Sequence, residues 1–381
     1  MKIIYISNSR IPTEKAHGFQ IIKMCEAFSA AGAEIELWLP KRFNRIKENP
    51  FSYYGVKETF SIKKIPVIDI ISLEKILGPI VSWIGSISFA ILTFFYLSKN
   101  QAPEIIYSRD QFVSWFLSFL NRKFIYEIHS FPRNFRLHKR LWKKAYCIIA
   151  ITQGLKNLLV KHGINSEKIL VAPDGVDLEF FNSISPSKED NRIELGLSPD
   201  DFLVGYVGRF KTLDMEKGIK TMISTLPLLD KETKMVFVGG EEFEIKEYKN
   251  MANRLNVFTQ CLFVDHQPYL KVVKYMKAMD ALIIPFPNTP HYAFYASPLK
   301  LFEYMAAGRP IIASDLPALR EILNDKNALF FKPESTDDLA RAVKMLKLSQ
   351  TLEYHLSGQA FSDVKQYTWH NRAKNILKFI Q

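Results

Sequence analysis

Two short apolar runs enclose a segment that carries helix signals at both of its ends. The runs, residues 281–285 and 311–314, are typical of strands buried in a parallel sheet. Between them, Ser297 suits a helix N-cap, Pro298 suits the first helical position, and Gly308 suits the residue that ends the helix. This order predicts a strand–helix–strand crossover, and therefore a chain of the α/β class with parallel sheets.

The start of this helix is also a candidate anion site. Its first turn, at Ser297, Pro298 and Leu299, would lie at the carboxyl edge of the sheet, where N–H groups and the helix dipole attract phosphate. Lys300 would add positive charge there, and Glu303 would accept hydrogen bonds from hydroxyl groups. An ordinary packed helix carries the same end signals, so a purely structural role stays open.

Strand and helix patterns alternate along the rest of the chain. Its 381 residues, 48% of them hydrophobic, are enough for two domains that each have a core. A polar segment at 183–198 is typical of a connection, which places the boundary near residue 185. The predicted strands, one of them with its turn, cover residues 2–7, 34–39, 105–108, 124–128, 147–151, 168–172, 202–207, 234–240, 262–264, 281–285 and 311–314.

Two cations flank the first predicted loop of the second domain. Arg209 follows the strand at 202–207, and Lys217 precedes the next helix. An arginine fork and a lysine ammonium at this spacing could reach one diphosphate. Solvated surface charge is the alternative interpretation.

Two residues of the first domain are candidates at the equivalent sheet edge. Gly18 lies in the polar segment at 8–19, where a glycine would let the backbone approach a ligand closely, although a plain connecting loop is equally compatible. His129 directly follows the strand at 124–128, and it is either a ligand contact or a structural histidine.

The segment at 297–310, Ser-Pro-Leu-Lys-Leu-Phe-Glu-Tyr-Met-Ala-Ala-Gly-Arg-Pro, resembles the nucleotide-sugar signature of glycosyltransferase family 4. Val-Gly-Arg at 207–209, Glu-Lys-Gly at 216–218 and Tyr-Glu-Ile-His-Ser at 126–130 resemble further motifs of that family. The resemblance implies the GT-B fold, in which two Rossmann-like domains with parallel sheets face an interdomain cleft. It gives an acceptor domain at 1–185, a nucleotide-sugar domain at 186–364, and a terminal helix at 365–381 that crosses back onto the first domain.

The resemblance also implies roles for the candidate residues. Glu303 would bind the nucleotide ribose, and the turn before it would wrap the diphosphate. Arg209 and Lys217 would neutralise the leaving diphosphate, and His129 would face the transferred sugar. Gly18 would lie near the donor phosphates.

Two positions add to this assignment. Residues 265–268, which include His266, occupy the place where the family recognises the nucleobase through backbone groups. Tyr295 stands where the family pattern has a first glutamate that touches sugar hydroxyls, so the identity of the donor sugar stays open.

The expected activity is therefore retaining transfer of a sugar from a nucleotide-diphosphate donor, a UDP-sugar being favoured. No metal and no further cofactor is expected, because the two cations would do the work of a divalent ion. The first alternative is a nucleotide-sugar epimerase of the same fold. The second is a non-catalytic protein that binds nucleotide sugars.

Charge and one apolar segment bear on localisation and partners. The net charge of +12 favours anionic partners, whereas the scattered basic residues argue against nucleic acid. Residues 76–98 lack formal charge and are interpreted as a buried helix, an interfacial helix or a membrane span. We expect a cytoplasmic protein, peripheral on the inner face of a membrane, whose acceptor is a glycan or a polyprenyl-diphosphate-linked sugar.

Overall fold

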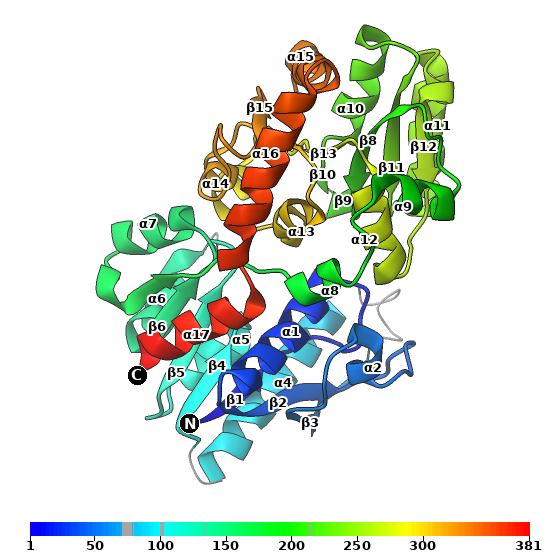
Figure 1. The fold of residues 1–381 in the computed structure, drawn as a ribbon. Helices are drawn as coiled ribbons and strands as arrows, with labels where there is room; N and C mark the ends of the chain where they lie inside the picture. Colours follow the sequence, from blue (N-terminus) through cyan, green and yellow to red (C-terminus); the bar gives the residue numbers. More distant parts are fainter. Residues whose placement is uncertain (71–77, 79, 100–102, 133, 213–214) are drawn as a thin grey trace. The chain divides into compact units, whose positions relative to one another are not determined.

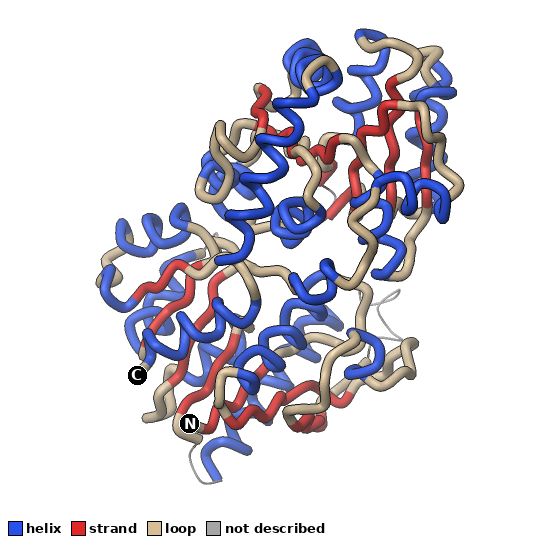
Figure 2. Tube along the Cα trace, in the orientation of Figure 1, coloured by secondary structure: helices blue, strands red, loops and turns tan. Residues whose placement is uncertain are grey.

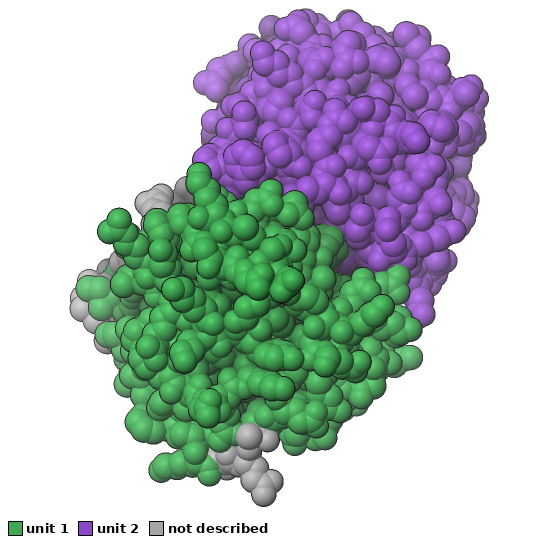
Figure 3. Space-filling view, turned by 90° about the vertical axis from the view of Figure 1, so that its left-hand side faces the viewer, with its two compact units in different colours: residues 1–174, 369–381 green, residues 175–368 purple. Residues whose placement is uncertain are grey.

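The structure, a computed structural model, describes residues 1–70, 78, 80–99, 103–132, 134–212 and 215–381. The chain divides into two compact units (Figure 3). Unit 1 comprises Met1–Asp174 together with Trp369–Gln381, and unit 2 comprises Gly175–Thr368. Unit 2 begins at Gly175, before the boundary expected near residue 185. The reason is that Val176, Phe181 and Ile184 are buried in the core of unit 2.

Unit 1 is built on a seven-stranded sheet in the order β3-β2-β1-β4-β5-β6-β7, with every neighbouring pair parallel. Strand order reverses on either side of β1, which pairs with β2 and with β4, so ligand-binding residues are expected at the carboxyl ends of these strands. The strands are β1 (Lys2–Ile6), β2 (Glu34–Lys41), β3 (Ser61–Pro66), β4 (Ile105–Ser108), β5 (Phe124–Ile128), β6 (Cys147–Ala150) and β7 (Ile169–Val171).

The helices of unit 1 cover both faces of this sheet, because right-handed crossovers that leave β1 in opposite directions place their helices on opposite sides (Figure 1). The C-terminal helix α17 packs on α1. The helices are α1 (Ala16–Ala30), α2 (Pro50–Tyr54), α4 (Ile80–Lys99), α5 (Gln111–Leu117), α6 (Phe135–Lys144), α7 (Gln153–Lys161) and α17 (Trp369–Ile380).

Unit 2 has a six-stranded sheet in the order β12-β11-β8-β13-β14-β15, again with every neighbouring pair parallel, and a small antiparallel hairpin of β9 and β10 (Figure 2). The strand order reverses at β8, which pairs with β11 and β13. The strands are β8 (Phe202–Val207), β9 (Lys211–Thr212), β10 (Met215–Glu216), β11 (Thr233–Val238), β12 (Cys261–Val264), β13 (Ala281–Ile284), β14 (Ile311–Ser314) and β15 (Leu329–Phe331).

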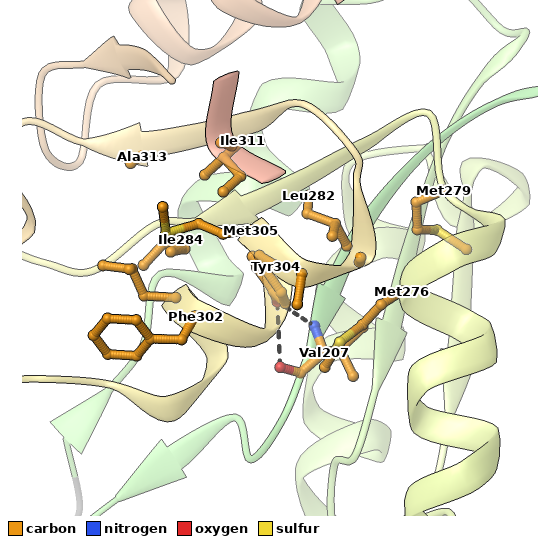
Figure 4. Close-up of a cluster of buried hydrophobic side chains, with 14 of the residues drawn as sticks. Val207, Met276, Met279, Leu282, Ile284, Phe302, Tyr304, Met305, Ile311 and Ala313 are labelled. Atoms are coloured by element: carbon orange, nitrogen blue, oxygen red, sulfur yellow. Dashed lines mark hydrogen bonds between the residues drawn. The ribbon is translucent and has the colours of Figure 1, made fainter. Parts of the chain in front are cut away.

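Helix α13 lies in the centre of the unit 2 core, against β13 and β14 (Figure 4). Its Tyr304 hydroxyl accepts from the N–H of Val207 at 2.8 Å and donates to the carbonyl of the same residue at 3.2 Å, which ties the helix to the end of β8. The helices are α8 (Leu178–Asn182), α9 (Lys188–Leu195), α10 (Ile219–Thr225), α11 (Glu242–Arg254), α12 (Tyr269–Ala278), the π-helical turn η5 (His291–Tyr295), α13 (Leu299–Ala307), α14 (Pro317–Arg320), α15 (Thr336–Lys347) and α16 (Gln350–Asp363).

Two local predictions need correction. Helix α13 begins at Leu299 with Pro298 at the N-cap, one residue later than expected, because Pro298 has an extended backbone (φ −76°, ψ 130°). Gly18 lies in the first turn of α1 and not in a loop. A Cβ on Gly18 would lie 2.3 Å from the Tyr54 hydroxyl, so packing against Tyr54 accounts for the glycine.

Most of the apolar segment at 76–98 forms α4; residues 76, 77 and 79 lie outside the described part of the chain. One side of α4 is buried, with Phe89 and Leu97 almost fully inaccessible, whereas Trp83 and Phe95 are 58% and 52% exposed. Within the described residues, no helix combines the length and the hydropathy that a membrane crossing requires. Helix α4 is therefore not wholly buried, because it exposes aromatic side chains on one side.

Candidate active site

The turn after β8 forms one wall of the candidate site in unit 2. Gly208 has a φ of +129°, and a Cβ there would lie 3.0 Å from the Lys300 ammonium nitrogen. The same nitrogen lies 3.5 Å from the centroid of the Tyr206 ring. Lys300, the second residue of α13, therefore reaches the residue directly before Arg209.

Lys300 is buried, with 8% of its surface exposed. Its ammonium nitrogen has no hydrogen-bond acceptor among the described residues. Burial, followed by repulsion from Lys217, holds the pKa of Lys300 well below its ordinary value. The charge of Glu303 opposes this decrease but does not outweigh it, so a protonated Lys300 is unfavourable in the free protein and would be stabilised by an anion.

Lys217 interacts electrostatically with both Arg209 and Lys300. Burial and then the neighbouring Arg209 lower the pKa of Lys217 to about 8. Lys217 in turn lowers the pKa of Lys300 and, after burial, that of His291 in η5. Arg209 is 40% exposed, with Nη1 3.6 Å from Glu241 Oε1. The structure thus brings Arg209, Lys217 and Lys300 together at the carboxyl edge of the sheet, where a diphosphate would relieve their mutual repulsion.

Glu303 lies one turn further into α13. Its Oε1 accepts a hydrogen bond of 3.0 Å from the Tyr269 hydroxyl at the start of α12. Burial raises the pKa of Glu303, although the Tyr269 hydrogen bond and the positive Lys300 oppose the increase. The ring of Tyr269 stacks on Phe180 of α8 at 5.2 Å. Glu303 therefore has a fixed position beside the cations, as a hydroxyl-binding carboxylate requires.

The other predicted residues of unit 2 occupy the same sheet edge. Ser297 and Pro298 precede the first turn of α13. His266 is exposed in the loop after β12. Because β11 separates β12 from β8, His266 lies two strands away from Arg209. Tyr295 is the last residue of η5.

In unit 1, His129 follows β5, and its Nε2 lies 2.5 Å from Glu127 Oε1. Burial and the positive Arg109 lower the pKa of His129 more than Glu127 raises it. The imidazole is therefore neutral at pH 7. Arg109 donates to Gln20, Gln20 donates to Glu127, and Glu127 contacts His129, so the carboxyl ends of β4 and β5 share one polar network.

Four residues of these sites were not predicted from the sequence: Tyr269, His291, Glu127 and Arg372. A signal existed for Glu127, since a charge within the apolar strand at 124–128 must be paired when buried. No local pattern points to Arg372, which is 245 residues away from its partner Glu127.

Family models match both halves of the chain. The family described as "Glycosyltransferase Family 4" matches residues 19–180, and the family described as "Glycosyl transferases group 1" matches residues 187–361. The break between the two matches falls at the start of unit 2, close to Val176–Ile184.

Individual curated relatives share only about a quarter of their aligned residues with this chain. A glycosyltransferase of Methanocaldococcus jannaschii is 24% identical over 60% of this chain and 58% of its own length. A D-inositol 3-phosphate glycosyltransferase of Actinosynnema mirum is 25% identical over 55% of this chain and 51% of its length. The putative teichuronic acid biosynthesis glycosyltransferase TuaC of Bacillus subtilis is 25% identical over 61% of this chain and 54% of its own length. The chain thus spans between half and three fifths of the curated relatives it matches.

Solved structures match the whole chain. HepE of Anabaena, in complex with UDP and glucose, superposes with a TM-score of 0.74 at 17% identity and covers 99% of this chain and 98% of its own. Sucrose-phosphate synthase of Thermosynechococcus elongatus gives a TM-score of 0.75 at 18% identity, with 99% and 97% covered. At such low sequence identities these matches show the fold alone. With family models over both halves and a parallel sheet in each unit, the chain belongs to glycosyltransferase family 4 and has the GT-B fold.

Proposed function

We propose that the protein is a retaining glycosyltransferase that moves a sugar from a nucleotide-diphosphate donor to a glycan or a lipid-linked acceptor. The observation that carries this proposal is the group of three basic residues, Arg209, Lys217 and Lys300, in which burial and then mutual repulsion lower the pKa of both lysines. Such a group is costly to maintain without an anion, and it lies where open α/β sheets bind phosphate.

In the proposed reaction the bond between the sugar C1 and the diphosphate breaks, and its electron pair stays on the phosphate oxygen. A hydroxyl oxygen of the acceptor forms the new bond to C1, and the proton of that hydroxyl passes to the leaving diphosphate. Arg209, Lys217 and Lys300 stabilise the charge that develops there, which is commonly the largest catalytic contribution. Because side chains supply this charge, we expect transfer to continue in the presence of EDTA. Loss of activity in EDTA, restored by a divalent cation, would overturn this expectation.

The rest of the donor is assigned to the neighbouring residues. Glu303, held by Tyr269, binds the ribose hydroxyls. The first turn of α13, from Ser297 to Leu299, contacts the diphosphate, and the loop around His266 contacts the base. The relative HepE was crystallised with UDP and with glucose, which supports a UDP-sugar as the donor.

The acceptor is proposed to be lipid-linked and to be used at the inner face of a membrane. The name of the relative TuaC supports a role in the biosynthesis of surface polysaccharide. Exposed apolar side chains of α4 and α5 support contact with a bilayer. These side chains, which we call the apolar face, are Ile80, Trp83, Ile87, Phe95, Trp115 and the adjoining Phe119.

A panel of nucleotide sugars tests the donor proposal by thermal shift, since a ligand at 100 times its Kd adds about 2.7 kcal/mol of stability. With the donor so identified, Arg209→Ala and Lys217→Ala are each expected to lower turnover about 100-fold. Arg254→Ala and Lys231→Ala, at exposed positions of the same unit, are the matched controls. Unchanged turnover in both site variants would reject the diphosphate assignment.

The same assay separates the alternatives. An epimerase converts a nucleotide sugar in the absence of any acceptor, whereas a transferase releases the nucleotide in proportion to the acceptor consumed. A binding protein shows the thermal shift without turnover. Either outcome would replace the transferase proposal.

A further inference from the structure

Glu127 is a fully buried carboxylate in the middle of unit 1. It belongs to β5, whose other residues, Phe124, Ile125, Tyr126 and Ile128, are apolar or aromatic. A charge in such a place is retained only when its oxygens are hydrogen-bonded and its charge is balanced. Its partners therefore define what the residue does.

Four side chains surround the two oxygens of this carboxylate. Oε1 accepts from Gln20 Nε2 at 2.7 Å and lies 2.5 Å from His129 Nε2. Oε2 accepts from the Tyr107 hydroxyl and from Arg372 Nη2 at 3.0 Å. A carboxylate has about four lone-pair positions, so these contacts use all of them.

The direction of the Gln20 hydrogen bond is fixed by its other partner. Gln20 Oε1 accepts from Arg109 Nη1, and a guanidinium can only donate. The amide nitrogen of Gln20 must therefore point to Glu127 and donate. This leaves His129 as the remaining partner of Oε1 whose hydrogen position is not yet determined.

Glu127 is ionised. Burial alone would raise the pKa of Glu127, but Arg372, the His129 hydrogen bond and Arg109 together hold that pKa well below its ordinary value. An ionised carboxylate only accepts, so the His129 nitrogen that faces it at 2.5 Å must carry the proton.

The other ring nitrogen of His129 is then an acceptor. The ring is neutral at pH 7, because its pKa is lowered by burial and Arg109, so a proton on Nε2 leaves a lone pair on Nδ1. The side chain remains 22% exposed, and the hydrogen bond that its ring makes within the described part of the chain is the one from Nε2 to Glu127. A ligand hydroxyl that donates to Nδ1 would complete the geometry.

We propose that Glu127 and Arg372 are positioning residues that hold His129 in the Nε2–H tautomer and present Nδ1 as a hydrogen-bond acceptor to a sugar hydroxyl. The tautomer follows from the contacts within unit 1 alone. The role of Nδ1 toward a sugar rests on the proposed function.

Arg372 brings the C-terminal helix into this arrangement. Its Nε donates to the carbonyl of Pro173 at 2.8 Å, and its Nη2 donates to the carbonyl of Ala172 at 3.1 Å as well as to Glu127. Helix α17 packs on α1, which carries Gln20. The packing of α17 in unit 1 thus positions the Glu127 carboxylate, which in turn positions the His129 imidazole.

The tautomer can be measured directly on the full chain. With ¹⁵N-labelled histidine, long-range ¹H–¹⁵N correlation spectra distinguish a protonated Nε2 from a protonated Nδ1, and His129→Gln identifies the signals by their loss. At pH 7.5 we expect protonated Nε2 in the wild type. A wild type with protonated Nδ1, or with both nitrogens protonated, would overturn the proposal whether or not any variant folds.

Two variants test the cause. In Glu127→Gln the amide offers both a donor and an acceptor, so the Nε2–H signature should be partly or wholly lost. In Tyr107→Phe the tautomer should be unchanged, because Tyr107 contacts Oε2 and leaves the His129 contact intact. An unchanged signature in a folded Glu127→Gln variant would show that Glu127 does not select the tautomer.

Kinetics test the positioning role. Arg372→Gln should lower kcat by about 10- to 100-fold, by analogy with the loss of a partner that orients a metal-bound histidine, while the KM for the donor changes little. Lys374→Gln, exposed on the same helix, is the matched control. Equal kcat for both variants would reject the role of Arg372. If no nucleotide sugar is turned over at all, the proposed function fails, whereas the tautomer measurement is unaffected.

Discussion

The ammonium nitrogen of Lys300 lies 3.5 Å from the centroid of the Tyr206 ring. This contact satisfies only part of what a cation requires, because a ring face offers a weak quadrupole and no lone pair. Lys300 is 8% exposed, so water cannot supply the remainder. The free protein therefore maintains an unfavourable group whose benefit arises only when an anion binds.

Replacing Lys300 should improve stability and impair binding at the same time. In Lys300→Met the buried amine is replaced by an apolar side chain of similar length, so we expect an unchanged or higher Tm. Affinity for UDP should fall by about 1.5–3 kcal/mol, the contribution of a hydrogen bond to a charged group. Thermal denaturation and calorimetric titration with UDP measure the two effects. A lower Tm with unchanged UDP affinity would make Lys300 a structural residue.

Lys271→Met is the control for this substitution. Lys271 is exposed on α12 in the same unit, so its loss should alter neither quantity appreciably.

Nucleotide binding should weaken as the pH rises through 8. The pKa of Lys217 is lowered to about 8 in the free protein, so above this pH the amine is mainly neutral and must take up a proton when the diphosphate binds. Because binding takes up this proton, the affinity for UDP is highest below pH 8 and decreases above it, by about tenfold at one pH unit above the pKa. Titrations with UDP at pH 7 and pH 9 measure the difference.

The variant Lys217→Arg separates this residue from other groups. An arginine stays protonated throughout this range, so the decrease should become smaller while binding at pH 7 is largely retained. Lys300 contributes with the same sign, because its pKa is also lowered. A wild-type affinity that is constant from pH 7 to 9 would show that neither lysine changes protonation on binding.

The framework of strands could be predicted from sequence because most of them are apolar runs that are buried on both faces. The strands β4, β5 and β8 fall at the expected residues. The edge strands β3 and β15 were missed. Strand β3 (Ser61–Pro66) has two adjacent lysines and only one buried residue, and β15 has three residues, so neither forms an apolar run of the required length.

The candidate sites were predictable only where their residues are close in sequence. Arg209 and Lys217 flank one loop, and after burial it is the charge of Arg209 that lowers the pKa of Lys217. The burial of Lys300 was not predictable, because α13 has neighbours on several sides, α8, α12 and α16 among them, and amphipathicity shows one buried side only. The contact of Arg372 with Glu127 depends on how the C-terminal helix returns to unit 1, which no local pattern encodes.

Glu303 should give the protein its preference for ribose. Its position, held by the 3.0 Å hydrogen bond from Tyr269, suits a carboxylate that accepts from adjacent hydroxyls. We expect Glu303→Gln to weaken UDP binding by about 1–3 kcal/mol. The 2′,3′-dideoxy analogue of UDP should bind wild type and variant equally, since it cannot donate to either side chain. A variant that still distinguishes UDP from the analogue as the wild type does would move the ribose contact to another residue.

Binding to an anionic bilayer should depend jointly on the apolar face and on helix α6. The α6 residues Arg136, Lys139, Arg140, Lys143 and Lys144 are exposed, and the helix has no acidic residue. The two elements are in contact, since the Arg140 guanidinium lies 4.1 Å from the centroid of the Phe119 ring. Each basic residue near an anionic surface contributes about 1 kcal/mol, and inserted aromatic side chains add apolar burial.

Flotation with vesicles that contain anionic lipid measures this binding. We expect the protein to float at low salt and to be largely released at 0.5 M salt, because the charge contribution is screened. Replacing Lys139, Arg140 and Lys143 by Gln should abolish flotation at low salt, and Trp83→Ser with Phe95→Ser should weaken it. The control replaces Lys246, Lys249 and Lys271, exposed lysines of unit 2, and changes the net charge equally. If this control lowers flotation as much as the α6 variant does, binding reflects net charge and not a defined surface. Transfer assays with soluble and lipid-linked acceptors complete the test: a preference for the soluble acceptor, together with no flotation, would remove the membrane proposal and leave the sugar transfer proposal standing.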